Sequence, residues 1–251
     1  MSEETLTLAR PDGQTIAVRR RPGAAGDARP GVMFFGGFLS DMTGTKATYL
    51  DAWAVDHGRA FTRFDYFAHG ASSGQWEDAT ISRWREDALT VLDDATEGPQ
   101  ILVGSSLGGW MALLAAMARP ERVKALVLIA PAADFTEALM WEQFPLHVRE
   151  AIEREGSWRA PSAYGQPYLI TKRLIEDGRR WSILNDPIPV TAPVRILQGY
   201  ADPDVPWTHA MRTLEALESQ DVTLHLSKSG DHSLSSADDL ARLVETVEAV
   251  S

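Results

Sequence analysis

The sequence predicts an α/β fold in which helices flank a mostly parallel central sheet. Three short apolar runs, at residues 32–35, 101–103 and 123–129, are each closely followed by Gly or Pro. Continuous apolar runs are typical of strands that are buried on both faces, as in a parallel sheet. Helical patterns lie between these runs, and strands that alternate with helices indicate an α/β architecture.

Further strands are predicted on either side of these runs. Residues 5–8 and 16–20 alternate apolar and polar side chains around Pro11-Asp12-Gly13, which predicts an opening hairpin. Residues 61–64 and 194–197 are partly apolar, follow the same pattern and predict two more strands of the sheet.

Two segments carry the apolar spacing of amphipathic helices. One stripe covers residues 81–92, and a second covers residues 240–247 near the end of the chain. Ser236 and Asp239 precede the second stripe at the spacing of a capping box, which predicts where that helix begins.

The alternation of strands and helices breaks between about residue 134 and residue 185. This stretch holds no convincing strand, and its aromatic residues stand among many charges: Trp141, Phe144, Trp158, Tyr164, Tyr168 and Trp181. We therefore expect a helical insertion between two strands of the sheet.

The composition excludes several classes of function. A formal net charge of −11 opposes nucleic-acid binding, which requires clustered Lys and Arg. The absence of cysteine excludes disulfides, thiolate zinc sites and cysteine nucleophiles. With 251 residues, 44% of them hydrophobic, the chain is long enough for one large domain with a buried core.

We expect a cytoplasmic enzyme. Residues 1–10 carry acidic side chains and no long apolar run, which is unlike a secretory signal. The longest apolar stretches, near residues 107–117 and 123–133, are too short to cross a bilayer, so no membrane span is predicted.

A G-x-S-x-G sequence, Gly104-Ser105-Ser106-Leu107-Gly108, follows the predicted strand at residues 101–103. A predicted helix at residues 107–118 comes directly after the serines and ends before a proline. A serine on a sharp strand-to-helix turn is exposed above the sheet, and the helix N-terminus favours negative charge there. We therefore expect Ser106 to be a nucleophile, with Ser105 as the neighbouring alternative.

A serine hydroxyl needs a base that removes its proton. In proteins with this kind of turn, the nucleophile comes first along the chain, the acid second and the histidine last. Three histidines lie late enough in this chain to be the base: His209, His225 and His232. His225 lies in an apparent strand, where a lone histidine is usually structural, and His209 lies in the first turn of a predicted helix. His232 lies in a loop before the last helix, where a base can reach across the sheet, so we predict that His232 is the base.

The acid that orients this base should follow the strand at residues 194–197. Residues 198–206 supply two carboxylates, Asp202 and Asp204. The spacing from Gly199 favours Asp202, and Asp204 remains the alternative. A buried carboxylate that accepts a hydrogen bond from the imidazole Nδ1–H would fix the tautomer and stabilise the imidazolium.

Acyl transfer also requires N–H donors for the oxyanion that develops on the carbonyl. One predicted donor is the N–H of Leu107, the residue after the nucleophile. The second is the N–H of Phe38, which follows Gly36 and Gly37 after the strand at residues 32–35. Glycine at these positions lets the backbone approach a substrate closely.

Long stretches of the chain resemble the α/β-hydrolase superfamily. Within it, the chain is similar to the group of the mitochondrial palmitoyl-protein thioesterase that is also called mycophenolic acid acyl-glucuronide esterase. The matching stretches are residues 37–47, 63–66, 98–110, 187–190, 202–207 and 231–232. The resemblance implies an α/β-hydrolase fold with Ser106, Asp202 and His232 as its catalytic triad, the same three residues that the local patterns favour.

The resemblance also implies a helical cap over the active site. The cap would span residues 133–189, between core segments at residues 1–132 and 190–251. The substrate contacts that we predict are Leu39, Trp141, Phe144 and Trp158; the alternative for the cap aromatics is that they only pack within the cap or against the core. Two departures from the family stand out: Ser233 replaces its usual basic residue, and Gln198 holds a place that is often histidine.

Together these residues predict a serine hydrolase that cleaves carboxylic esters or thioesters through an acyl-enzyme on Ser106, with no metal and no organic cofactor. The resemblance adds long-chain acyl thioesters, acyl glucuronides and acylated proteins as substrates. Three alternatives remain: a C–C hydrolase or a small peptidase with the same triad, and a non-catalytic scaffold that binds ligands without turnover.

Overall fold

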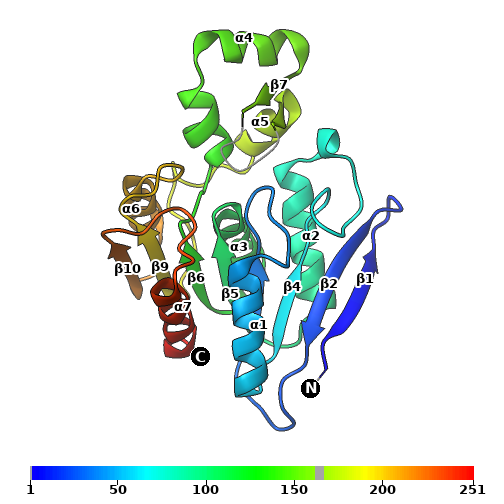
Figure 1. The fold of residues 1–251 in the computed structure, drawn as a ribbon, viewed down its shortest axis with the longest axis vertical. Helices are drawn as coiled ribbons and strands as arrows, with labels where there is room; N and C mark the ends of the chain where they lie inside the picture. The colour runs from blue at the N-terminus through cyan, green and yellow to red at the C-terminus, as the bar shows by residue number, and fades with distance from the viewer. Residues whose placement is uncertain (1, 162–166) are drawn as a thin grey trace.

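An eight-stranded sheet forms the centre of the structure, a computed structural model that describes residues 2–161 and 167–251. The strand order is β1-β2-β4-β3-β5-β6-β9-β10 (Figure 1). β2 runs antiparallel to β1 and β4, and the other neighbouring strands pair in parallel, which confirms the opening hairpin and the mostly parallel sheet. The strands are β1 (Glu4–Ala9), β2 (Thr15–Arg21), β3 (Gly31–Phe35), β4 (Phe61–Phe64), β5 (Gln100–Ser105), β6 (Val123–Ile129), β9 (Val194–Gly199) and β10 (Val222–Ser227).

Helices cover both faces of this sheet. On one face lie α1 (Thr45–His57) and α7 (Ala237–Ala249); on the other lie α2 (Ile81–Asp94), α3 (Leu107–Ala118) and α6 (Trp207–Ala216). Successive side chains of a strand point to opposite faces. Val32 of β3 accordingly packs with α1 and α7, whereas its neighbour Met33 packs with α2 and α3. Because both faces are buried, the central strands read as continuous apolar runs.

The last helix begins where the sequence predicts. The Ser236 side chain accepts a hydrogen bond from the N–H of Asp239, and the Asp239 carboxylate accepts one from the N–H of Ser236. This capping box satisfies two backbone groups that the first turn of α7 leaves without helical partners. It thereby fixes the end of the loop that carries His232.

A cap is inserted between β6 and β9 and stands over one end of the sheet (Figure 1). It contains α4 (Leu146–Glu155), β7 (Ser157–Ala160), β8 (Tyr168–Thr171) and α5 (Lys172–Arg179). The insertion contains helices, but the expectation that it holds no strand is wrong, because β7 and β8 form an antiparallel pair. In that pair, alternate side chains, Ala160 and Ile170 among them, pack against α4 and form a small core of the cap. Tyr164, one of the aromatic residues noted in the sequence, lies outside the described residues.

None of the described helices combines the length and the apolar composition that are needed to cross a bilayer.

Candidate active site

Ser106 occupies a strained turn between β5 and α3. Its φ of +55° and ψ of −119° are unusual for a residue with a side chain. The turn is so tight that a Cβ on Gly104 would lie 2.3 Å from the carbonyl oxygen of Gly108. Ser106 N–H donates to the carbonyl of Ile129, at 2.8 Å, and this bond anchors the turn to β6. The conformation lifts the serine side chain above the carboxyl end of the sheet.

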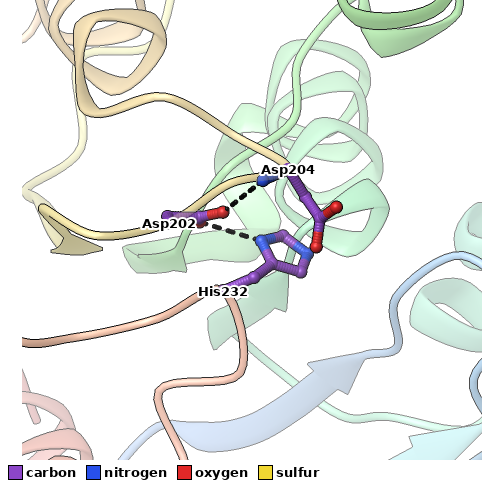
Figure 2. Close-up of side chains that lie close together, drawn as sticks. All are labelled: Asp202, Asp204 and His232. Atoms are coloured by element: carbon purple, nitrogen blue, oxygen red, sulfur yellow. Dashed lines mark hydrogen bonds and ion pairs between the residues drawn. The ribbon is translucent and has the colours of Figure 1, made fainter. Parts of the chain in front are cut away.

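The structure brings His232 and Asp202 to Ser106. The Ser106 hydroxyl lies 3.2 Å from His232 Nε2, and His232 Nδ1 lies 2.9 Å from Asp202 Oδ2. With its proton on Nδ1, the imidazole donates to Asp202 and its Nε2 accepts from the Ser106 hydroxyl. Figure 2 shows the imidazole of His232, from the loop before α7, facing the loop after β9 that carries Asp202.

Asp202 is buried, and its carboxylate accepts several hydrogen bonds. It is 7% exposed, and its Oδ1 accepts hydrogen bonds from the N–H groups of Asp204 and Val205, each at 2.9 Å. Gln198 Nε2 donates to Asp202 Oδ2 at 3.2 Å, a contact that the sequence did not predict. Burial alone would raise the pKa of Asp202, but the hydrogen bonds from His232 and the two backbone groups outweigh it and hold that pKa below its usual value.

Asp204, the alternative acid, lies beside the same imidazole but does not accept its Nδ1 proton (Figure 2). Asp202, Asp204 and His232 are the one group of three side chains, among the described residues, with potential metal-ligand atoms within 4.8 Å of one another. Two of these side chains are joined by the Asp202–His232 hydrogen bond, which accounts for their proximity without a metal ion.

The other two late histidines lie elsewhere. His209 is buried in the first turn of α6, where its Nε2 is 2.7 Å from the carbonyl oxygen of Ala133. His225 is exposed on β10. Of these three histidines, His232 is the one that contacts Ser106.

The predicted oxyanion donors border the same cavity as Ser106. Leu107 is the first residue of α3, so its N–H has no acceptor within the helix. Gly37 brings the loop after β3 close to Ser106, because a Cβ added there would lie 3.6 Å from Ser106 Cβ. The ring of Phe38 contacts Trp76, Trp84, Phe135 and Tyr168 at centroid distances of 5.2–6.0 Å.

A cavity of about 530 Å³ opens over Ser106, within the usual range for small-molecule sites. Its apolar half is formed largely by the cap and the residues leading into it: Phe38, Ala132, Phe135, Leu139, Met140, Phe144 and Tyr168. Its polar half is formed by the loop after β3, the start of α1 and the His232 loop: Ser40, Asp41, Thr45, Lys46, Ser233 and Ser235. The two halves therefore differ in the chemistry that they offer a substrate.

Two of the four predicted substrate contacts line this cavity. Leu39 and Phe144 do, whereas Trp141 and Trp158 are not among its lining residues. Trp158 packs on Phe144 at 5.8 Å, and the guanidinium of Arg179 lies 4.9 Å from the Trp141 ring centre. Both tryptophans thus pack within the cap.

Lys46 is a site residue that the sequence analysis missed. Its ammonium donates to the carbonyl of Ser233, the residue after His232, and so ties α1 to the His232 loop. Burial lowers the pKa of Lys46, although the carboxylates of Asp231 and Asp239 oppose this effect. A lone lysine in the sequence gives no signal of such a contact, because 187 positions separate it from Ser233.

Comparisons with known proteins agree with this architecture. The sequence profile of the family described as alpha/beta hydrolase fold matches residues 49–156. The human protein "Palmitoyl-protein thioesterase ABHD10, mitochondrial" is 40% identical over 243 residues, which cover 96% of this chain and 78% of the human protein; the bovine protein matches to the same extent. The chain belongs to the α/β-hydrolase family.

Solved structures of α/β hydrolases match over nearly the whole chain. A crystal structure described as a putative hydrolase from Agrobacterium vitis S4 is 41% identical with a TM-score of 0.93, and the match covers 99% of this chain and 98% of that one. Alpha/beta hydrolase domain-containing protein 10 from mouse is 39% identical with a TM-score of 0.90, and 98% of each chain is covered. These structures agree with a hydrolase, and the mammalian sequence relatives are named thioesterases.

The prediction of a cytoplasmic enzyme is wrong. The five mammalian relatives, each matched over 96% of this chain, are named mitochondrial. The prediction depended on the absence of a recognised signal or spanning segment, and such an absence does not determine the compartment of an α/β hydrolase.

Proposed function

We propose that this α/β hydrolase cleaves acyl thioesters and carboxylic esters through an acyl-enzyme on Ser106. The observation that carries the proposal is the line of two hydrogen bonds that joins Ser106 to His232 and His232 to Asp202. In this arrangement an imidazole can take the serine proton while a carboxylate holds its tautomer. The name of the mammalian relatives, palmitoyl-protein thioesterase, supports a thioester as the bond that is cleaved.

In the first half of the reaction, Ser106 Oγ attacks the acyl carbon while its proton moves to His232 Nε2. The carbonyl oxygen becomes an oxyanion that accepts hydrogen bonds from the N–H groups of Leu107 and Phe38. The bond to sulfur or oxygen then breaks, and the leaving thiol or alcohol takes the proton from His232 Nε2. Ser106 is left as an ester of the acyl group.

In the second half, water replaces the leaving group. His232 Nε2 takes a proton from water as the water oxygen attacks the acyl carbon. The second tetrahedral intermediate collapses, Ser106 Oγ recovers its proton from His232, and a carboxylic acid leaves. Asp202 keeps Nδ1 protonated through both halves and stabilises the imidazolium that forms in each.

The cavity suggests how the substrate lies. An acyl chain suits the apolar half, where Leu139, Met140 and Phe144 would remove it from water. The leaving group would then occupy the polar half, where serine and threonine residues offer hydrogen-bonding partners. These residues suit a polar leaving group such as a peptide or the sugar of an acyl glucuronide.

The proposal is tested with p-nitrophenyl butyrate, a butanoyl thioester and a fluorophosphonate probe. Ser106→Ala should remove labelling and lower kcat for both substrates by at least about 10³-fold, since the nucleophile is lost. Ser105→Ala, which deletes the neighbouring hydroxyl, is the matched control and should still be labelled. Turnover by Ser106→Ala at the wild-type rate would refute the proposal. If the wild-type protein neither hydrolyses the two substrates nor reacts with the fluorophosphonate probe, the result would instead indicate the non-catalytic scaffold.

A further inference from the structure

Leu39 has a backbone conformation that leucine seldom adopts. Its φ is +58°, in the left-handed region where the Cβ of an L-residue is crowded. Leu39 is the third residue of a turn that the Ser40 N–H closes on the carbonyl of Gly37, at 3.2 Å. A turn with positive φ at this position normally takes glycine, so contacts from elsewhere must hold the leucine there.

His69 supplies one such contact. The N–H of Leu39 donates to His69 Nε2 at 3.2 Å, and His69 Nδ1 lies 3.0 Å from the carbonyl oxygen of Phe67. Both bonds can exist together only if the imidazole is neutral with its proton on Nδ1. His69 is 4% exposed, and burial lowers the pKa of its imidazole, which favours that neutral form.

The imidazole of His69 is itself rigidly held. Its ring packs against Trp76 and Trp84, with each ring centroid 5.3 Å away. The carbonyl of Phe67 accepts a further hydrogen bond from Trp84 Nε1 at 3.1 Å, and the N–H of Phe67 donates to Asp87 Oδ2 at 2.7 Å. Trp84 and Asp87 are buried residues of α2, so His69 links the turn at Leu39 to the buried face of that helix.

Phe38 lies between these restraints. Its ring contacts the same two tryptophans that contact His69. The N–H of the next residue, Leu39, donates its hydrogen bond to His69. The side chain and the following peptide of Phe38 are thus both fixed, and with them the direction of the Phe38 N–H. In the proposed reaction this N–H is an oxyanion donor, and such donors act only when they are aimed in advance.

We propose that His69 is a positioning residue that aims the Phe38 N–H at the oxyanion by accepting a hydrogen bond from Leu39. The inference rests on the proposed function, since the oxyanion arises only if Ser106 Oγ attacks an acyl carbon. A second tether, from the N–H of Met42 to Asp65 Oδ1 at 2.7 Å, holds the far end of the same loop. Loss of the His69 bond should therefore displace the turn locally and leave the fold intact.

Two substitutions test the roles of the two ring nitrogens of His69 one at a time. In His69→Asn the amide lies where Nδ1 lay, so the donor to Phe67 is kept and the acceptor for Leu39 is lost. In His69→Gln the amide oxygen reaches the position of Nε2 and can still accept from Leu39. We expect His69→Asn to lower kcat about 10- to 100-fold with little change in KM, which is less than the loss of an oxyanion donor itself. His69→Gln should stay within about threefold of wild type.

A transition-state readout distinguishes this role from a packing role. A trifluoromethyl ketone that forms an adduct with serine should bind His69→Asn more weakly by the same factor as the fall in kcat/KM. His225→Asn, the same change at an exposed histidine, is the control and should bind the ketone as wild type does. Equal activity of the Asn and Gln variants, or a loss that appears only in KM, would overturn the proposal.

The wild-type protein gives an independent test if His69→Asn does not fold. At pH 7 the ¹⁵N resonances of His69 should report a neutral ring protonated on Nδ1, and a doubly protonated ring or a proton on Nε2 would overturn the proposal. The two inferences fail separately. If Ser106→Ala keeps its activity, the proposed function fails; if Ser106→Ala is inactive while His69→Asn matches wild type, only the role of His69 fails.

Discussion

His232 Nε2 lies 3.2 Å from Ser106 Oγ, although 126 positions separate the two residues in the chain. Ser106 follows β5 and His232 follows β10, and in the sheet β6 and β9 lie between these strands. The loop after β10 must therefore pass over the end of β9. Gly199 and Gly230 permit this passage, because a Cβ on Gly199 would lie 2.3 Å from the carbonyl oxygen of Gly230.

The two carboxylates beside His232 should differ in their effect on catalysis. Asp202→Asn should lower kcat about 10⁴-fold, because an amide that donates to Nδ1 favours the wrong imidazole tautomer. Asp204→Asn should lower it less than tenfold, since the Nδ1 proton is donated to Asp202. Steady-state kinetics on the ester substrate measures both. A larger loss in Asp204→Asn would show that the acid has been assigned to the wrong residue.

The stability of the protein should depend on Asp202 in a pH-dependent way. Because its pKa is lower in the folded chain than its ordinary 3.8, the unfolded chain binds more protons in acid. The contribution of Asp202 is thus fully present above the unfolded pKa and is lost as the pH falls through the folded pKa. The difference in unfolding free energy between wild type and Asp202→Asn should therefore shrink between about pH 5 and pH 2. Urea denaturation across this range tests the sign, and a difference that grows in acid would contradict it.

The glycine after Leu107 should contribute strongly to the stability of the fold. A Cβ on Gly108 would lie 2.1 Å from the carbonyl oxygen of Phe35, a backbone atom that cannot move without shifting β3. Gly108→Ala should cost more than about 3 kcal/mol of unfolding free energy, which is large against a typical total of about 5–15 kcal/mol. Gly36→Ala is the control, because an added Cβ there meets nothing within 4 Å. Similar melting temperatures for the two variants would contradict this account of the turn.

The apolar half of the cavity should set the preference for acyl length. Met140→Trp would fill part of that half, so kcat/KM for a hexadecanoyl thioester should fall at least about tenfold relative to a butanoyl thioester. Leu146→Trp is the control, since this cap residue is 71% exposed and is not among the cavity's lining residues. An equal loss for both chain lengths in Met140→Trp would show that the acyl chain does not lie against the cap.

The sheet and the turn at Ser106 were predictable because their signals are local. The apolar runs of β3, β5 and β6 reflect burial on both faces, and Gly104 and Gly108 mark the tight turn around Ser106. The cap hairpin was missed because β7 and β8 have only four residues each, too few for a clear alternation.

The supporting residues of the site were not predictable from local patterns. His69 precedes Ser106, so chain order does not single it out, and its contact with Leu39 exists only once two loops meet. Trp141 and Trp158 are aromatic residues of the cap, but which of its side chains reach the cavity depends on how the cap packs. Lys46 meets the His232 loop through tertiary structure alone.

The most direct test of the proposed mechanism is to locate the acyl group during turnover. The protein is mixed with a slowly hydrolysed p-nitrophenyl ester, quenched in acid, digested and examined by mass spectrometry. We expect the acyl mass on the peptide that contains Ser106, localised to that side chain and absent from Ser106→Ala. Hydrolysis that proceeds with the acyl group on another residue, or with no acylated residue at any time point, would contradict the central claim.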